Sequence, residues 1–341
     1  MNYKKLEKIC SLCGSSGDEK AVREYIISEI KDYADSYFTD PLGNLIVHKK
    51  GKQKSEKKVM FAAHMDEVGF MITGIKSDGT LAFDAVGGID ADVVIGRQVY
   101  IPYADCYGVT GTKPIHRLSK KQREEAPVFS SMYIDIGAEN EKEAKKIIPL
   151  GTYAYFADEI TKLGGNKICS KAIDDRAGCQ ILIDMIKSDM KYDTEFLFSV
   201  QEEIGLRGAG AGAYTINPDI AIVIETTTAA DIDSSEGAER VCVLGEGPVI
   251  LYRDRRTMYD RELYNLAVSV AEKNGIKWQT KTKVAGGNDS GSIQISRGGV
   301  KTLAVSVPCR YLHSPSTVMD MGDYELCEKL AEKLAEAVVE V

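Results

Sequence analysis

The chain has 341 residues, a length that predicts two domains and a substantial apolar core. Its formal net charge of -8 at pH 7 argues against a nucleic-acid partner, because phosphate binding requires clustered Lys and Arg side chains. No apolar run approaches the length of a membrane span, and the first residues lack the apolar centre of a signal peptide. We therefore expect a cytoplasmic protein, with no membrane partner, whose eight cysteines are reduced thiols.

The first stretch, roughly 3–37, has a helical pattern that is interrupted at Gly14. Cys10 and Cys13 form a C-x-x-C motif there, but no second Cys or His pair follows at zinc-finger spacing. Two buried thiols on one face of a helix explain this motif better than a redox or zinc site does.

A strand pair around the turn at Leu42 comes next, followed by the apolar run 59–64, which is typical of a buried parallel strand. From about residue 70 to 162, short alternating segments separated by glycines predict a small β-rich domain that closes as a barrel. Its one clear helical pattern is 141–147. The basic stretch 113–123, which contains His116, is expected to be a mobile surface loop.

After Gly164 the pattern alternates between strands and helices. Helices are predicted near 175–189, 205–214, 259–274, 289–297 and from 324, and strands near 194–200, 220–225, 277–283 and 302–307. This alternation predicts an α/β fold with a mostly parallel sheet flanked by helices. The catalytic domain would comprise residues 1–69 and 163–341, and residues 70–162 would be an inserted β-barrel domain.

Polar clusters follow the apolar strands, where open α/β sheets bind their ligands. They contain His64 and Asp66, Asp174 and Asp175, Glu202 and Glu203, Glu225, and His313. Each cluster alone has an ordinary explanation, such as a core histidine, a helix cap, an exposed strand end or a surface loop. Together, two of the chain's four histidines and several carboxylates make a suitable ligand set for paired divalent metals such as zinc.

The motifs around these clusters resemble those of the tetrahedral aminopeptidases, a family that includes glutamyl aminopeptidases and proteins long labelled endoglucanase M. They are HMDEVG from His64, IDDRAG from Ile173, VQEEIGLRGA from Val200, GGNDSG from Gly286 and RYLHSP from Arg310. The resemblance spans nearly the whole chain in order and spacing, including the insertion. It implies a zinc-peptidase-like α/β fold and the removal of N-terminal residues from short peptides.

The resemblance also implies roles for individual residues. Asp174 would bridge two divalent metal ions per subunit, most readily Zn²⁺ or Co²⁺, and the peptide bond after it would be cis. His64 and Glu225 would complete one metal site, and Glu203 and His313 the other. Glu202 would be the general base for the attacking water and then the acid for the leaving amine. Asp66 would accept a hydrogen bond from the second ring nitrogen of His64. Glu225 departs from the family, which usually has aspartate there.

For the insertion, the resemblance implies a dimerisation domain, with dimers assembling into a homododecamer; a β domain without a role in assembly is the alternative. A glycoside hydrolase is a rival function, but its two-carboxylate mechanism needs neither two histidines nor a shared aspartate. Aromatic side chains on which sugar rings could stack are also hard to place, because Trp278 is the single tryptophan. A non-catalytic scaffold is the third hypothesis, and the complete ligand set argues against it.

Specificity is left open by the sequence. The resemblance implies that Asn288, Asp289 and Ser290 line the substrate pocket. The nearby arginines Arg253, Arg255 and Arg256 could suit acidic side chains, but surface or assembly residues explain them better.

Overall fold

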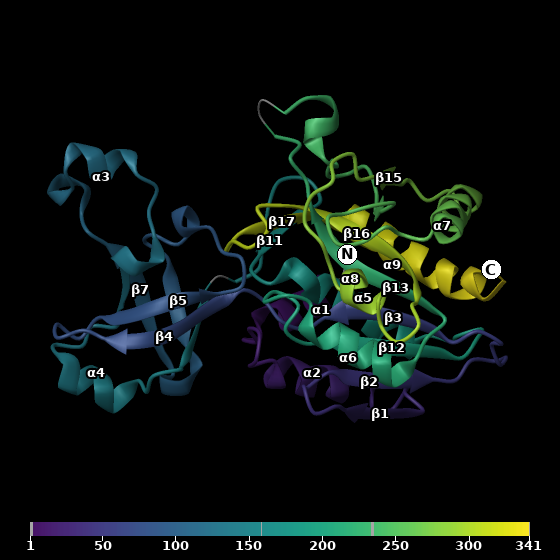
Figure 1. Ribbon diagram of the computed structural model, residues 1–341, viewed down its shortest axis with the longest axis horizontal. Helices are drawn as coiled ribbons and strands as arrows, with labels where there is room; N and C mark the ends of the chain where they lie inside the picture. The colour runs from purple at the N-terminus through teal and green to yellow at the C-terminus, as the bar shows by residue number, and fades with distance from the viewer. Residues whose placement is uncertain (1–2, 158, 233–234, 341) are drawn as a thin grey trace.

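The computed structural model describes residues 3–157, 159–232 and 235–340. It consists of an α/β body and a barrel that projects to one side of it (Figure 1). Within these residues, no helix combines the length and the hydropathy that crossing a bilayer requires.

The body is built on an eleven-stranded sheet in which β1-β2-β12-β3-β13-β16-β17-β11-β10 are successive neighbours, while β14 pairs with β16 and β15 pairs with β14. The strands are β1 Ser36–Thr39, β2 Leu45–Lys49, β3 Val59–His64, β10 Thr161–Lys162, β11 Lys167–Ser170, β12 Thr194–Ser199, β13 Ile220–Thr228, β14 Val249–Ile250, β15 Gln279–Thr280, β16 Lys301–Arg310 and β17 Thr317–Asp320. The predicted parallel arrangement holds for the central strands β12, β3, β13 and β16. The outer pairs are antiparallel.

Helices cover both faces of this sheet, because successive side chains of its buried strands point to opposite sides. In β3, Phe61 packs into one apolar cluster, and Met60 and Ala62 pack into the other. The helices are α1 Lys4–Ser11, α2 Lys20–Ile30, α5 Ile173–Lys187, α6 Arg207–Ile216, α7 Arg261–Lys273, α8 Ser290–Ile293 and α9 Met321–Ala337. α6 and α8 cover the face with Met60, and the others cover the face with Phe61.

The barrel is closed in the order β4-β5-β8-β7-β6-β9 and lies between β3 and β10 in the chain. Its strands are β4 Gly69–Ile75, β5 Leu81–Val86, β6 Gln98–Ile101, β7 Cys106–Thr112, β8 Met132–Asp135 and β9 Tyr153–Phe156. Phe70 packs edge-on against Phe83 and Phe156 in its core, at ring-centroid distances of 5.2 and 5.0 Å. The helix α4, Glu141–Ile147, has the predicted bounds, whereas the basic stretch predicted as a loop contains the helix α3, Lys120–Glu124.

Several predicted bounds need correction. Glu225 does not end its strand, because β13 stays paired with β16 as far as Thr228. β12 ends at Ser199, so Glu202 and Glu203 lie in the loop after it, where Gln201 adopts a positive φ. The predicted strand 277–283 and helix 289–297 shrink to β15 and α8. β15 is short because its only partner in the described chain, β14, has two residues.

The predicted pair of buried thiols on one helix face is only half correct, because Cys13 is partly exposed. Cys10 is fully buried in α1, but Cys13 lies beyond the end of that helix. Burial raises the pKa of the Cys10 thiol to about 12 and that of Cys13 to about 11. Both thiols are therefore held in their unreactive, protonated form at neutral pH.

Candidate metal centre

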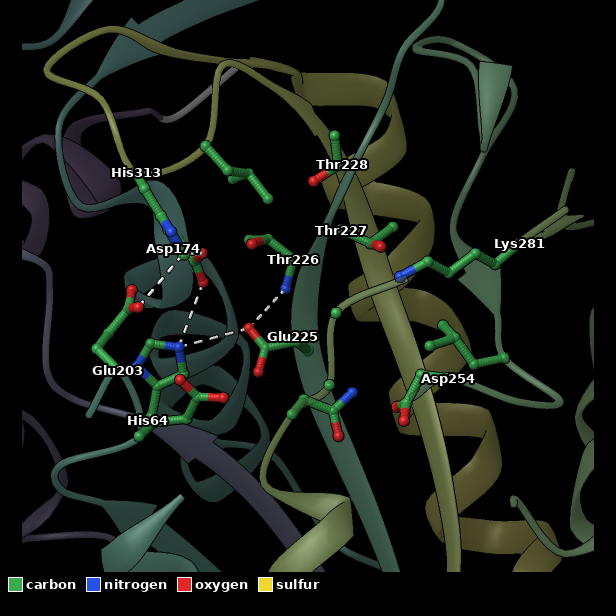
Figure 2. A pocket seen from close by; sticks show the side chains of 16 residues that line it. His64, Asp174, Glu203, Glu225, Thr226, Thr227, Thr228, Asp254, Lys281 and His313 are labelled. Atoms are coloured by element: carbon green, nitrogen blue, oxygen red, sulfur yellow. Dashed lines mark hydrogen bonds and ion pairs between the residues drawn. The ribbon is translucent and has the colours of Figure 1, made fainter. Parts of the chain in front are cut away.

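The candidate site lies at the carboxyl ends of the parallel strands and opens into a cavity of about 240 Å³ (Figure 2). Its lining includes the predicted ligands and several polar residues that the sequence did not single out. The lining residues are His64, Asp174, Glu202, Glu203, Glu225, Thr226, Thr227, Thr228, Leu251, Asp254, Lys281, Gly286, Gly287, Asn288, Leu312 and His313.

His64, the last residue of β3, is held by the loop that follows it. Its Nδ1 lies 3.0 Å from the backbone oxygen of Asp66 and 3.5 Å from the Asp66 carboxylate, so the carbonyl is the closer of the two partners. A proton on Nδ1 leaves the lone pair of Nε2 directed at the cavity, as a metal ligand requires. The Asp66 carboxylate in turn accepts hydrogen bonds from the backbone N–H groups of Glu202 and Glu203 at 3.0 and 3.1 Å.

Asp174 occupies the centre of the cluster. The peptide bond that joins it to Asp175 is cis, as the family resemblance implies. Its Oδ1 lies 3.3 Å from His64 Nε2, and its Oδ2 lies 3.4 Å from His313 Nε2. One carboxylate therefore faces both imidazoles, one with each oxygen.

Each imidazole also faces a glutamate of its own. His64 Nε2 lies 3.5 Å from Glu225 Oε1, and His313 Nε2 lies 3.3 Å from Glu203 Oε2. His313 Nδ1 donates to the carbonyl of Gly88 at 2.9 Å, and Gly88 belongs to the segment between β5 and β6 of the insertion. Every site residue predicted from the sequence lies outside the insertion, and this contact is not predicted because it is made by a backbone carbonyl, which no side-chain pattern reveals.

The donor set fits divalent metal ions in both composition and spacing. A tetrahedral ion with bonds of about 2.0–2.2 Å separates neighbouring ligand atoms by about 3.4 Å. The nitrogen–oxygen separations in this site are 3.3 to 3.5 Å. Nitrogen from histidine and oxygen from carboxylates are ligands that zinc and related ions accept.

Among the described residues, His64 also groups with Asp175 and Glu225 in a way that could hold a metal. We favour Asp174 over Asp175 as the ligand. Asp175 does not line the cavity, and its Oδ1 accepts the backbone N–H of Gly178. Burial also raises the pKa of Asp175 well above its usual range, which favours the protonated form that binds metals poorly.

The electrostatics of the cluster indicate a shortage of positive charge. Burial raises the pKa of Glu203 to about 8 and that of Glu225 to about 7. Burial opposes charge on His313 as well, but Asp174 and Glu203 outweigh it and raise the pKa of His313 to about 10. The carboxylates therefore draw protons onto the imidazoles, and bound cations would take the place of those protons.

Glu202 differs from its neighbour Glu203. Its side chain lines the cavity and has no hydrogen-bond or ion-pair partner in the part of the chain that the structure describes. Burial raises the pKa of Glu202 well above its usual range, and the Glu225 carboxylate adds to the effect. An unpartnered carboxylate with a high proton affinity suits proton transfer.

The residues predicted for substrate binding fall into two groups. Asn288 lines the cavity, whereas Asp289 and Ser290 lie fully buried behind it. The Asp289 carboxylate accepts the hydroxyl of Ser199 there. The arginines 253, 255 and 256 are exposed and do not line the cavity, in agreement with the surface interpretation. The cation of the cavity is Lys281, which the sequence does not distinguish from Lys277 or Lys283.

Comparison with known proteins places these observations in a family. The family model for M42 glutamyl aminopeptidases matches residues 43–330. A relative in Acetivibrio thermocellus is 41% identical over 335 residues, which cover 98% of this chain and 97% of its own. The lysyl aminopeptidase of Pyrococcus furiosus is 33% identical, with coverage of 98% and 97%.

Solved structures agree with these matches. The TET1 peptidase of Pyrococcus horikoshii, which can assemble into a tetrahedron or a large octahedral shell, has a TM-score of 0.86 at 37% identity and covers 98% of this chain and 99% of its own. A protein of Thermotoga maritima described as an endoglucanase has a TM-score of 0.82 at 35% identity, with 98% coverage of both chains.

Proposed function

Since this chain belongs to the M42 glutamyl aminopeptidase family and is thus a peptide-bond hydrolase, we propose that it removes N-terminal residues from short peptides with two divalent cations per subunit. The observation that carries the proposal is the position of Asp174. Each of its oxygens faces one imidazole, and each imidazole faces a glutamate of its own. Such a symmetrical set is suited to two ions that share one carboxylate.

The proposed ligands are His64 and Glu225 for one ion, Glu203 and His313 for the other, and Asp174 for both. When bound, the two cations would polarise the scissile carbonyl and acidify a water molecule; Zn²⁺ and Co²⁺ suit the donor set. Asp66 acts as a positioning residue, because its backbone oxygen and carboxylate hold His64 and the loop that carries the two glutamates.

Proton transfer is assigned to Glu202. Its carboxylate takes a proton from the attacking water and then delivers that proton to the nitrogen of the leaving amine. No hydrogen bond or ion pair within the described residues engages this carboxylate, so it is available for both steps. The free α-amino group of the substrate would be held by the cations or by the surrounding carboxylates, which explains action at N-termini.

The proposal extends to location and assembly. We propose a cytoplasmic homo-oligomer, in which the barrel joins subunits into dimers and the dimers form a dodecamer. The TET1 relative supports assembly into a closed shell, and the projecting barrel exposes large apolar side chains such as Tyr103 and Leu150. A closed shell would restrict access to short peptides.

The glycoside hydrolase alternative draws its support from the descriptions of two structural relatives, one of which is described as a peptidase as well. The site itself argues against it, because its carboxylates are paired with imidazoles around a shared aspartate rather than arranged as an acid and a nucleophile across a sugar. A degenerate scaffold would not need a complete donor set.

The test is an assay of the purified protein, first stripped with a chelator and then reloaded with Zn²⁺, Co²⁺ or Mn²⁺. The substrates are aminoacyl chromogenic amides and a soluble glucan. We expect amide hydrolysis that disappears with the chelator and returns with a metal, and no release of sugar. Glucan cleavage without amide cleavage would overturn the proposal.

A further inference from the structure

The wall of the cavity away from the metal centre carries a buried cation. Lys281 follows β15, is 7% exposed, and donates from Nζ to the carbonyl of Ala285 at 2.8 Å. It forms no ion pair with any carboxylate of residues 3–157, 159–232 or 235–340. In Figure 2 its side chain reaches into the cavity beside Thr227, on the opposite side from His64 and His313. A buried ammonium with one carbonyl partner has N–H groups left to donate, and an anion is their most favourable acceptor.

The other charged residue on this wall is already engaged. Asp254 is 2% exposed, and its Oδ1 accepts the backbone N–H groups of Arg256 and Thr257, both at 2.7 Å. Its Oδ2 accepts the hydroxyl of Tyr259 at 2.6 Å. Binding a substrate cation would compete with these hydrogen bonds, so Asp254 serves the local turn, and Lys281 is the charge available to a ligand.

Neutral groups complete the wall between Lys281 and the metal centre. Thr226, Thr227 and Thr228 line it from β13, and Leu251 lines it from the segment after β14. Successive side chains of a strand point to opposite faces, and Thr227 is the threonine beside Lys281 in Figure 2, so the wall there presents one ammonium and one hydroxyl group, which together can hold a carboxylate.

We propose that Lys281 selects substrates whose N-terminal residue has a carboxylate side chain. This inference rests on the proposed aminopeptidase function. With the α-amino group and the scissile carbonyl at the metal centre, the first side chain extends past Thr227 towards Lys281. Family membership does not decide this preference, because a glutamyl family description and a lysyl relative both match the chain.

The experiment compares the full-length, metal-loaded protein on glutamyl, glutaminyl, leucyl and lysyl anilides. Glutamine has the shape of glutamate without its charge, so the ratio of kcat/KM for the glutamyl and glutaminyl anilides isolates the carboxylate. We expect a ratio of about 10 to 100 in the wild type, as for a hydrogen bond to a charged partner. In Lys281→Met the ratio should fall to about 1, and Lys281→Arg should restore part of it. Both kcat/KM values are measured on the same preparation, so their ratio does not depend on the fraction of the protein that is active.

Lys283→Met is the matched control, because Lys283 is exposed and lies two residues further along the same segment. Its ratio should equal that of the wild type. An unchanged ratio in Lys281→Met, or a wild type that cleaves the leucyl or lysyl anilide without favouring glutamyl over glutaminyl, would overturn the inference and leave the proposed function standing. Failure to cleave any of the four would overturn the function and the inference with it.

The anilides lack the C-terminal carboxylate that a peptide substrate has. A second experiment therefore uses the dipeptide Leu-Leu. If Lys281→Met slows cleavage of the dipeptide relative to leucyl anilide but leaves the glutamyl preference intact, Lys281 binds the C-terminal carboxylate of the substrate. That result would also overturn the proposal.

Discussion

Asp174 and the groups around it show how single side chains set the chemistry of this site. Both imidazoles approach Asp174 with Nε2, while their Nδ1 atoms are held by backbone carbonyls of Asp66 and Gly88. Fixing one ring nitrogen by a backbone carbonyl sets the orientation of the other, so the site is arranged before any ion binds.

Because Asp174 is proposed to serve both ions, its loss should differ from the loss of a ligand that serves one. We expect Asp174→Ala to bind neither metal tightly and His313→Ala to lose mainly one of two. Metal content per chain, measured by mass spectrometry after gel filtration, distinguishes these outcomes. Two tightly bound ions in Asp174→Ala would rule out the shared role.

The neighbours Glu202 and Glu203 allow the same chemical change to be tested in two roles. Glu202→Gln should keep both metals and lose turnover by at least about 10²–10⁴-fold, because the shape is retained and the proton carrier is removed. Glu203→Gln should instead weaken metal binding, since an amide is a poorer ligand than a carboxylate. Metal content and kcat are measured on both variants. Near-normal turnover in Glu202→Gln would exclude it as the general base.

At this scale the sequence predicts charge-bearing motifs well and cavity walls poorly. The predicted ligands come together because parallel strands end at one edge of the sheet. Glu225 was expected at a strand end, yet it points into the cavity from within β13, because strand pairing continues past it. Lys281 could not be found at all, since its burial depends on packing between segments distant in the sequence.

At the scale of elements, a buried arginine joins the site to the helices behind it. Arg176 of α5 is fully buried and donates to the carbonyls of Met65 and Ile9, both at 2.8 Å. It also approaches Glu67 at 3.4 Å, and Glu67 is paired with the buried Lys171 at 2.8 Å. The loop after β3, which holds His64, is thereby attached to both α1 and α5.

Replacing Arg176 with methionine should therefore destabilise the protein. The substitution keeps much of the apolar stem but leaves buried carbonyls and part of the Glu67 charge without partners. Breaking a buried ion pair from one side costs about 3–5 kcal/mol. Urea denaturation of metal-free Arg176→Met should show a clear loss against the wild type, while Arg261→Met, at an exposed position in α7, should show little change. Equal midpoints for all three proteins would refute the role of this arginine.

Elements with a strong pattern of their own were predicted closely, and those that depend on a partner were not. α4 has its predicted bounds, because its polar N-cap and helix-forming residues act locally. The short β15 pairs with β14 and the short α8 packs against α6, and no local pattern predicts either contact. The antiparallel outer strands of the sheet likewise follow from chain topology rather than from side-chain alternation.

At the scale of the whole molecule, the insertion contacts the body at more than one point, and one of these contacts reaches the candidate metal centre. Tyr155 of β9 donates to Asp18 at 2.6 Å, and Gly88 holds His313. Deleting residues 70–162 would therefore remove a carbonyl that orients a proposed ligand as well as any interface between subunits. Substitutions on the outer surface of the barrel test assembly without disturbing the site.

Tyr103 and Leu150 are suited to this purpose, because they are 70% and 64% exposed and line the same surface hollow. If the barrel joins subunits, the double variant Tyr103→Ser, Leu150→Ser should form a smaller particle, since each buried apolar side chain stabilises an interface. Ile295→Ser is the matched control on the body, where Ile295 is 78% exposed. Light scattering measures particle mass, and metal content verifies that the site is intact. A full-sized assembly in the barrel variant, together with a smaller one in the control, would mean that the body drives assembly and that the barrel contributes to the candidate metal centre through Gly88.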